Sequence, residues 1–242
     1  MTLETLFPLR IAIFDDDYYA LKWNTALVMR DPRTTVVIET LNAGDLIQQM
    51  DEVDAIDIVV LDMEYNDEKW PLPLLLNEIK SKYQAKIICL SQYGNQKILW
   101  TAIETGVDSF LIKDDVRMSI VPALMKCMFT KHVISPSIKE LIRDLSTEIW
   151  GEYSVIPKWI PTPEMTPQIL TAFWMRVFFG MRSPIVAEEM GVANGTVDRY
   201  VNLAYGILPN NLGDEDYLFG LDLDKYSAED RAFLLFTLPP SN

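Results

Sequence analysis

The sequence has 242 residues, 49% of them hydrophobic, and a formal net charge of −14. This length suits two domains that each bury a core, and no apolar run reaches the roughly 18 residues of a membrane span. The only histidine, His132, excludes catalytic triads and histidine-rich metal sites, so a metal would need oxygen ligands, which Mg²⁺ prefers.

Three further expectations follow from composition. The N-terminus lacks the basic start and long apolar core of a secretory signal, so we expect a cytoplasmic protein with no membrane contact. Cys89 and Cys127 lie in apolar surroundings without CxxC spacing and are interpreted as buried free thiols. Because an acidic chain repels the phosphate backbone, binding to nucleic acid would require a local basic patch.

The first half of the chain alternates short apolar runs with segments of helical periodicity. Strands are predicted at 10–14, 35–39, 56–62, 85–91 and 109–113. Helices are predicted at 18–30, 43–50, 71–83, 95–105 and 116–131. Asp17 is a plausible N-cap for the first helix, and Gly106 closes the fourth. This alternation predicts an α/β fold with a five-stranded, doubly wound parallel sheet of the flavodoxin-like kind.

Polar side chains stand where the predicted strands end. If strands one, three, four and five lie side by side, one edge of the sheet carries Asp15, Asp16, Asp62, Ser91 and Lys113. The carboxyl edge is where open α/β sheets bind ligands. Taken singly, Lys113 could be an ordinary salt-bridge partner and Ser91 a turn residue. Their joint occurrence favours a functional site.

The cluster suits phosphoryl chemistry. Asp16 and Asp62 supply hard anionic oxygens for Mg²⁺, and a backbone carbonyl near Glu64 could complete the protein ligands. With the metal and Lys113 neutralising a phosphoryl group, Asp62 can attack it and form an acyl phosphate. Ser91 is placed to donate a hydrogen bond to a phosphoryl oxygen.

Residues 10 to about 142 resemble a response-regulator receiver domain. The motifs are Asp15-Asp16, Leu61-Asp62-Met63, Leu90-Ser91 and the segment 106–114, Gly-Val-Asp-Ser-Phe-Leu-Ile-Lys-Asp, which is close to the family's Gly-Ala-x-x-Tyr/Phe-Leu-x-Lys signature. The resemblance implies a phospho-accepting signalling protein rather than an enzyme, with a histidine kinase or another phosphodonor as its partner.

The resemblance also implies a role for each site residue. Asp62 would be the phosphoacceptor and, with Asp16, a direct Mg²⁺ ligand, while Asp15 would act through the outer shell. Lys113 and Ser91 would contact the phosphoryl group. The side chain of Phe110 would change rotamer with Ser91 when phosphate binds, and so move the neighbouring surface.

The loop after Asp62 departs from the family pattern. Receivers usually have a proline four residues after the phosphorylated aspartate and a glycine that opens the third helix, whereas this chain has Asn66 and Trp70-Pro-Leu-Pro73. A Mg²⁺-dependent phosphatase of the same sheet topology is an alternative. It would need a second aspartate two residues after Asp62, where Glu64 stands.

The second half differs in character. We predict a receiver domain at 9–133, a linker helix with a proline-rich linker at 134–164, a small all-α helix-turn-helix output domain at 165–212 and an acidic extension at 213–242. The extension is expected to contain a short helix from Ser227 to Phe236.

Residues 183–200 have helix-turn-helix spacing. Ala187 is small where two helices would cross, Gly191 can adopt the left-handed turn conformation, and Asn194 would begin the second helix. The segment resembles the DNA-binding domain of NarL/LuxR-type regulators, together with Ile134-Ser-Pro136 and Thr166-Pro167. Turns with small residues also occur between helices in other all-α domains, so a helical domain without a DNA-binding role is the alternative interpretation.

Two functions remain open for the output domain. In the first, the protein is a phosphorylation-switched transcription regulator that binds promoter DNA as a homodimer, with base or phosphate contacts from Arg182, Asn194, Thr196, Arg199 and Asn202. Arg176 would also contact phosphate. In the second, the output domain binds a protein partner, because residues 151–242 carry 6 basic and 12 acidic side chains.

Overall fold

The computed structural model describes residues 8–116, 119–143, 152–158, 164–178 and 180–207. The chain divides into two compact units, Met1–Trp159 and Ile160–Asn242, named here the α/β unit and the helical unit. Among the described helices, none combines the length and apolar character that crossing a membrane requires.

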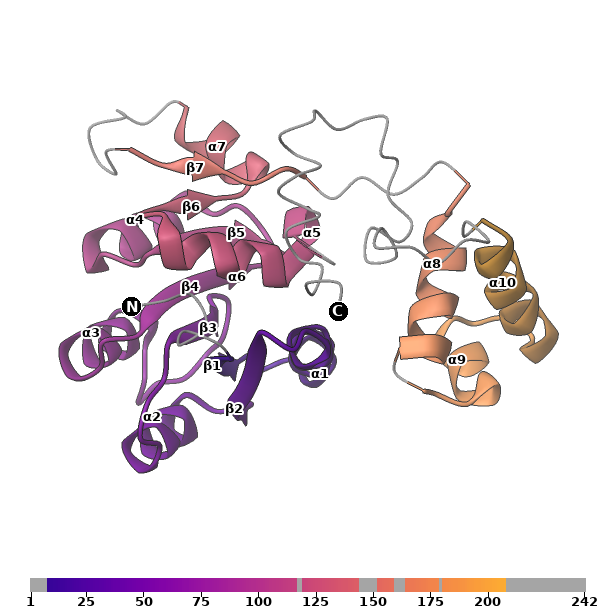
Figure 1. The fold of residues 1–242 in the computed structure, drawn as a ribbon, viewed down its shortest axis with the longest axis horizontal. Helices are drawn as coiled ribbons and strands as arrows, with labels where there is room; N and C mark the ends of the chain where they lie inside the picture. The colour runs from indigo at the N-terminus through magenta and orange to yellow at the C-terminus, as the bar shows by residue number, and fades with distance from the viewer. Residues whose placement is uncertain (1–7, 117–118, 144–151, 159–163, 179, 208–242) are drawn as a thin grey trace. The chain divides into compact units, whose positions relative to one another are not determined.

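A parallel sheet forms the centre of the α/β unit (Figure 1). Its first five strands are β1 (Leu9–Phe14), β2 (Thr34–Thr40), β3 (Ile58–Asp62), β4 (Lys86–Ser91) and β5 (Ser109–Ile112). They lie in the order β2-β1-β3-β4-β5. The order reverses at β1, which makes the sheet doubly wound and places a topological switch point between β1 and β3. The predicted flavodoxin-like fold is confirmed.

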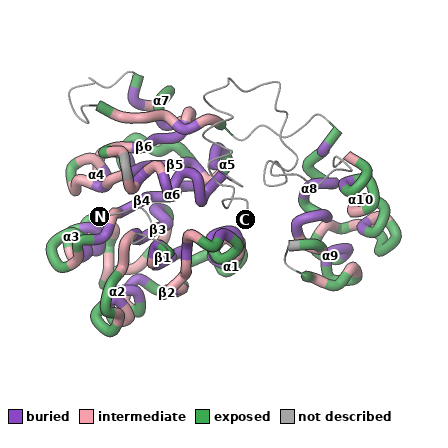
Figure 2. Tube along the Cα trace, in the orientation of Figure 1, coloured by how far each residue is buried: buried purple, intermediate pink, exposed green. Residues whose placement is uncertain are grey.

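Helices cover both faces of this sheet (Figures 1 and 2). Four of them share one core with strand residues such as Phe14, Leu61 and Phe110: α2 (Ala43–Glu52), α3 (Leu72–Lys82), α4 (Gln96–Thr105) and α7 (Pro136–Ile142). Alternate strand residues, among them Val60 and Ile88, face the other way and are also buried. On that face α1 (Tyr18–Arg30) and α6 (Ile120–Phe129) contact each other and the sheet.

Local signals set the helix ends as predicted. Asp17 caps α1, because its carboxylate accepts a hydrogen bond of 2.8 Å from the amide of Ala20. Gly106 ends α4 with a φ of +72°, a left-handed conformation that glycine adopts without strain.

Two short strands extend the sheet beyond the predicted five. β6 (Val133–Ile134) pairs with β5, and β7 (Ser154–Val155) pairs with β6, both in parallel. These residues fall at and within the segment predicted as linker, 134–164. Two-residue strands are too short to produce a periodic pattern, so sequence periodicity could not find them. The predicted domain boundaries remain a prediction, except that part of the predicted linker pairs with the sheet.

The helix predicted at 116–131 is two helices. α5 (Lys113–Val116) follows β5 directly, and α6 begins at Ile120. Pro122 is the third residue of α6, where a missing amide hydrogen removes no intrahelical bond. The prediction of one continuous helix was therefore wrong, and Pro122 lies close to the start of a helix rather than within one.

The helical unit contains α8 (Pro167–Phe173), a π-helical turn at Trp174–Phe178, α9 (Ser183–Glu189) and α10 (Asn194–Ile207). Val186, Ala187 and Val197 are buried in one small core. Gly191, with a φ of +62°, makes the turn between α9 and α10. This is the predicted helix-turn-helix. The acidic extension 213–242, with its predicted helix 227–236, lies outside the described residues.

Candidate functional site

The parallel pairing of β1, β3, β4 and β5 brings their carboxyl ends to one edge. Phe14 pairs with Leu61, and Asp62 pairs with Leu90. The polar residues that end or follow these strands therefore meet beside the switch point of the sheet, as the sequence predicted. The cluster consists of Asp15, Asp16, Asp62 and Lys113, and is named here the acidic pocket.

Three carboxylates of the acidic pocket lie close together. One oxygen from each of Asp15, Asp16 and Asp62 falls within 4.8 Å of the other two. Asp15 and Asp62 are only 2% and 4% exposed, whereas Asp16 faces solvent. Two buried anions beside a third require compensation by cations, because burial removes the hydration that would otherwise stabilise them.

Lys113 supplies one compensating charge. Its Nζ lies 2.7 Å from Asp15 Oδ2 and 2.7 Å from Asp62 Oδ1. The lysine starts α5 immediately after β5, so the end of one strand fixes a positive charge between carboxylates from two others. One lysine against three carboxylates leaves the pocket with an excess of negative charge.

The protonation of the pocket reflects this imbalance. Burial raises the pKa of Asp15 to about 6, although the bond from Lys113 opposes the rise. Burial and the charge of Asp62 raise the pKa of Asp16. Burial would lower the pKa of Lys113, but the bonds to Asp15 and Asp62 outweigh it and the pKa is raised. Lys113 is therefore a cation at neutral pH.

The donor set of the acidic pocket fits a hard divalent cation. It offers clustered carboxylate oxygens, without sulfur or imidazole, which is the chemistry Mg²⁺ and Ca²⁺ prefer over zinc. The backbone of the β3–α3 loop supports this arrangement, because the amide of Glu64 donates a hydrogen bond of 3.0 Å to Asp62 Oδ2. The Glu64 carboxylate points elsewhere and accepts a bond of 2.7 Å from the amide of Gln92.

Ser91 and Phe110 occupy the buried positions expected from their strands. Both are 0% exposed. The Ser91 hydroxyl donates a hydrogen bond of 2.6 Å to the backbone carbonyl of Tyr93. Phe110 lies in the core of the face that α4 covers.

The sequence analysis missed the role of Tyr65 in the divergent loop. Its ring packs edge-on against Phe14, with centroids 4.8 Å apart, and its hydroxyl donates a bond of 2.7 Å to the carbonyl of Trp70. Asp67 Oδ1 accepts from the amides of Lys69 and Trp70. The loop thus has its own internal anchors in place of the family's proline and glycine. The only available signal was an aromatic residue close to Asp62.

The helix-turn-helix presents most of the predicted binding residues to solvent. Arg182, Asn194, Arg199 and Asn202 are exposed, and Thr196 is half-buried. Arg176 is half-buried, and its guanidinium donates one hydrogen bond to the carbonyl of Met181 within the unit.

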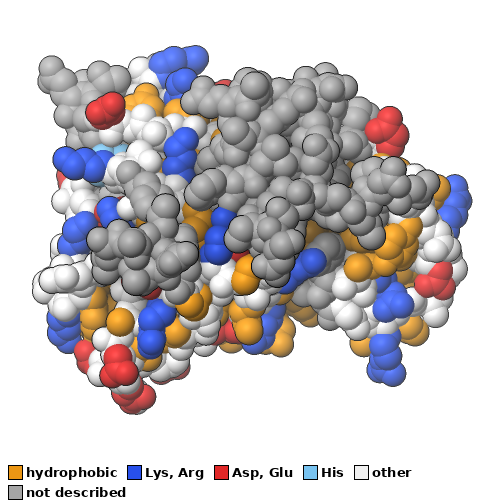
Figure 3. Space-filling model, in the orientation of Figure 1, with side chains coloured by type: hydrophobic (Ala, Val, Ile, Leu, Met, Phe, Trp, Pro, Cys, Tyr) orange, Lys and Arg blue, Asp and Glu red, His pale blue; other side chains and the backbone are white. Residues whose placement is uncertain are grey.

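The charge of the helical unit is unevenly distributed along the sequence. Residues 164–207 carry 3 basic and 4 acidic side chains, whereas residues 208–242 carry 2 and 7. Basic and acidic side chains are interspersed on the face of the described helices seen in Figure 3. The helix-turn-helix itself is therefore nearly neutral, and most of the acidic excess comes from the segment after it.

No protein-family model matches the chain. The probable transcriptional regulatory protein NarL of Mycobacterium tuberculosis (strain ATCC 25618 / H37Rv) is 28% identical over 120 residues, which cover 50% of this chain and 51% of that protein. The match thus spans about half the length of that relative. Transcriptional regulatory protein YdfI of Bacillus subtilis (strain 168) is 21% identical over 202 residues, covering 84% of this chain and 90% of that protein.

Solved structures of similar fold include RcsB of Salmonella enterica serovar Typhimurium. Its isolated REC domain, in the presence of the phosphomimetic BeF₃⁻, has a TM-score of 0.51 and 20% identity over 55% of this chain and 97% of that chain. RcsB bound to promoter P1flhDC has a TM-score of 0.53 and 16% identity over 96% of this chain and 98% of that chain. At these identities the likeness concerns the fold, which includes both units.

Proposed function

We propose a function from the premise that this chain is a two-component response regulator, with a receiver domain followed by a NarL/LuxR-type output domain. The α/β unit is the receiver and the helical unit is the output domain. Such a chain is a signalling protein rather than a metabolic enzyme. We propose that Asp62 accepts a phosphoryl group and that this event controls transcription through the output domain.

The proposed reaction is an in-line displacement at phosphorus. An oxygen of Asp62 forms the new bond to phosphorus, and the bond to the donor breaks, with its electron pair leaving on a kinase histidine nitrogen or on the acetate of acetyl phosphate. The product is an aspartyl phosphate. Lys113, which already lies 2.7 Å from Asp62, would then form an ion pair with an oxygen of the phosphoryl group.

The carboxylates of the pocket hold the cation in this proposal. Asp16 and Asp62 would bind Mg²⁺ directly, the Glu64 backbone carbonyl would add a ligand, and Asp15 would act through the outer shell. When bound, Mg²⁺ would offset charge on the transferring group. Asp15 would then keep Lys113 in position through its 2.7 Å bond.

Ser91 and Phe110 form the proposed switch. The Ser91 hydroxyl would leave the carbonyl of Tyr93 and donate to a phosphoryl oxygen on Asp62. Phe110 would turn with it, and the core under α4 would repack. Because packed cores adopt discrete arrangements, this small change could move the surface formed by α4 and β5.

The observation that carries the receiver proposal is the position of Lys113. An ordinary salt bridge pairs one lysine with one carboxylate, but Lys113 joins two buried carboxylates from different strands. Together with Asp16, the arrangement supplies a nucleophile, a cation site and a charge for the phosphoryl oxygens.

Intact-mass spectrometry with Mg²⁺ and acetyl phosphate tests the receiver proposal. The protein should gain one phosphoryl group, whereas Asp62→Asn should gain none. Glu68→Gln, an exposed carboxylate in the same loop, is the matched control and should be labelled like the parent. Equal labelling of the parent and Asp62→Asn would contradict the assignment. Steady release of phosphate with turnover would favour the phosphatase alternative.

For the output domain, we propose specific DNA binding by a homodimer. Asn194, Thr196, Arg199 and Asn202 lie along α10 and would reach base edges, while Arg182 at the start of α9 would contact phosphate. The near-neutral charge of residues 164–207 supports this proposal, because the repulsive excess lies after the helix-turn-helix.

Protein binding is the second candidate, and exposed apolar side chains favour it. Ile185, Leu203 and Tyr205 are 38%, 41% and 52% exposed on the output domain. Such side chains are what a protein partner buries, whereas a DNA surface usually carries more lysine and arginine.

A salt titration distinguishes the two candidates. The purified protein would first be used to select a binding sequence from a pool of random DNA. Fluorescence anisotropy would then measure binding to the selected DNA at several salt concentrations, with and without acetyl phosphate. Arg199→Ala should weaken specific binding roughly tenfold, because a good base contact contributes on the order of 1–3 kcal/mol. Lys69→Ala in the receiver is the control. Absence of any specific binding at low salt would favour the protein partner.

A further inference from the structure

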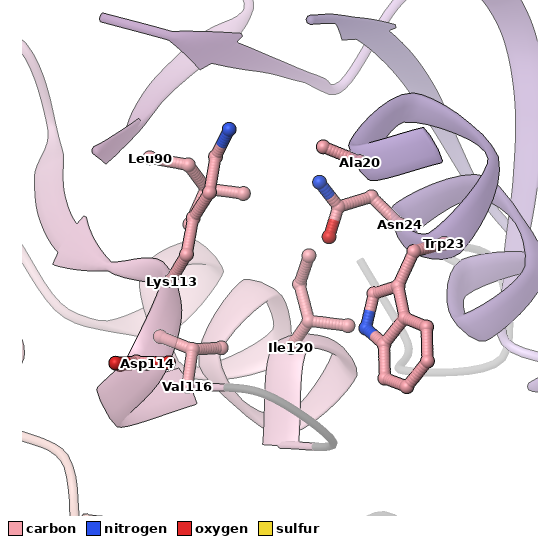
Figure 4. Close-up of a pocket in the computed structure, with 8 residues that line it drawn as sticks. All are labelled: Ala20, Trp23, Asn24, Leu90, Lys113, Asp114, Val116 and Ile120. Atoms are coloured by element: carbon pink, nitrogen blue, oxygen red, sulfur yellow. The ribbon is translucent and has the colours of Figure 1, made fainter. Parts of the chain in front are cut away.

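Lys113 also contributes to the wall of a cavity outside the acidic pocket (Figure 4). The cavity has a volume of about 260 Å³ and lies between α1 and the α5–α6 region of the receiver. Trp23 and Asn24 line it from α1, and Leu90, Val116 and Ile120 provide apolar walls. The receiver function proposed above uses none of these five side chains.

Asn24 is the unusual member of this lining. It is 7% exposed, and its carboxamide points into the cavity in Figure 4. Its side chain has no hydrogen-bond partner within the part of the chain that the structure describes. A carboxamide offers two donor hydrogens and an acceptor oxygen, and on the wall of a cavity these groups are available to a ligand.

We propose that this cavity binds a small, neutral, planar aromatic molecule that carries a carboxamide or lactam group. Such a group presents a donor and an acceptor side by side, which complements both functions of the Asn24 carboxamide. The aromatic ring would pack between Trp23 and the apolar side chains of Val116 and Ile120.

Size and charge narrow the class of ligand. The cavity is slightly smaller than the roughly 300–1,000 Å³ of most ligand pockets, so a molecule of one or two rings fits. Lys113 also lines the cavity, but its Nζ is engaged by Asp15 and Asp62. Asp114 stands at the edge and repels anions. A neutral ligand is therefore favoured over a carboxylate or phosphate.

Benzamide is the probe that tests the site. The full-length protein, labelled with ¹⁵N and without phosphodonor, is titrated with benzamide while the indole signal of Trp23 and the amides of α1 are followed by NMR. We expect saturable shifts at these positions. Acetophenone keeps the ring and the acceptor but lacks the donor hydrogens, so it should bind at least about tenfold more weakly.

Two variants separate a binding role from a structural one. Asn24→Leu should weaken benzamide binding about tenfold and leave the melting temperature largely unchanged, because the carboxamide has no hydrogen-bond partner to lose among the described residues. Ala20→Leu should also weaken binding, because its larger side chain narrows the cavity without removing any polar atom. Asn77→Leu on the exposed side of α3 is the matched control and should change neither property.

Two results would overturn the proposal. The first is benzamide binding that Asn24→Leu and Ala20→Leu leave unchanged, or shifts that map away from Trp23. The second is the absence of saturable benzamide binding to the parent; a fall in the melting temperature of Asn24→Leu would then identify Asn24 as a structural residue. Neither result depends on whether Asp62 is phosphorylated.

Discussion

Asp15 is the residue whose environment conflicts most with its charge. It is 2% exposed, and burial raises its pKa to about 6 even though Lys113 Nζ lies 2.7 Å away. A protein that needed this site only for stability would gain from a neutral side chain here. The cost makes sense if a divalent cation offsets the charge, since buried charges concentrate at functional sites.

The raised pKa of Asp15 gives a signed pH dependence without metal. Because its pKa is higher in the folded state than the ordinary 3.8, the folded protein holds more protons between about pH 4 and 6, and stability falls as pH rises through this range. We expect the free energy of unfolding in EDTA to fall by up to about 3 kcal/mol between pH 4 and 7, relative to Asp15→Asn. Urea unfolding at several pH values measures this.

Mg²⁺ provides the control for that series. At saturating Mg²⁺ the fall should largely disappear, because the cation favours the ionised carboxylates. If the free energy of unfolding in EDTA changed with pH in the same way for the parent and for Asp15→Asn, Asp15 would not be the source of the pH dependence.

Some site residues could be predicted from the sequence and others could not. Asp62 and Lys113 follow apolar strands directly, so their strand-end positions were visible in the pattern. Tyr65 and Asn24 acquire their environment only from tertiary packing, the first against Phe14 and the second beside a cavity. Neither contact leaves a periodic signal.

At the scale of elements, Asp115 joins three segments of the α/β unit. It belongs to α5 and is 0% exposed. It accepts hydrogen bonds of 2.8 and 3.0 Å from the amide and hydroxyl of Ser137 on α7. Lys158, just after β7, lies 3.2 Å from its carboxylate. The segment that precedes the helical unit is thus tied to the element that carries Lys113.

Asp115→Asn should destabilise the α/β unit at neutral pH by about 2 kcal/mol, because it removes charge-assisted hydrogen bonds. Burial opposes ionisation of Asp115, but the bonds from Ser137 outweigh it and lower the pKa. This stabilisation is present above the ordinary pKa of 3.8 and is lost as pH falls below it. Urea unfolding should show the gap between parent and variant narrowing below about pH 4.

Glu104→Gln, at an exposed position on α4, is the matched control for Asp115→Asn. It should change the free energy of unfolding by less than about 0.5 kcal/mol at either pH. An equal loss in both variants would mean that the network around Asp115 contributes nothing specific.

The helix-turn-helix offers two glycines for a matched comparison. Gly191→Ala should destabilise the helical unit by about 1 kcal/mol, because a φ of +62° strains any residue with a Cβ. Gly195→Ala should be neutral or slightly stabilising, because it lies in α10 with open space around an added Cβ. Thermal unfolding measures both, and equal effects would contradict the assigned turn.

At the scale of the whole molecule, charge separates along the chain. Residues 208–242 carry 7 acidic and 2 basic side chains, whereas residues 164–207 are nearly neutral. The charges can be counted from the sequence alone. The structure was needed to place the end of the last described helix, α10, at Ile207. The fold prediction succeeded for the five longer strands, because their apolar runs gave clear patterns. The two-residue strands β6 and β7 form only through pairing with a neighbouring strand, which leaves no pattern in the sequence.

Neutralising the acidic extension should strengthen DNA binding. Combined Asp214→Asn, Glu215→Gln and Asp216→Asn should raise affinity for DNA several-fold at low salt, and the gain should shrink as salt screens the charges. The control neutralises Glu52, Asp54 and Glu104, which are exposed on the receiver. Anisotropy titrations at several salt concentrations measure both, and equal gains would point to total charge rather than its place in the sequence.

Chemical mapping of the phosphorylated residue tests the central proposal most directly. An acyl phosphate reacts with hydroxylamine, which expels phosphate and leaves a hydroxamate on the carboxyl group that carried it. After incubation with Mg²⁺ and acetyl phosphate, peptide mass spectrometry should find the hydroxamate on Asp62, and EDTA during the incubation should prevent it. A hydroxamate on another carboxylate, or equal modification with EDTA present, would contradict the account.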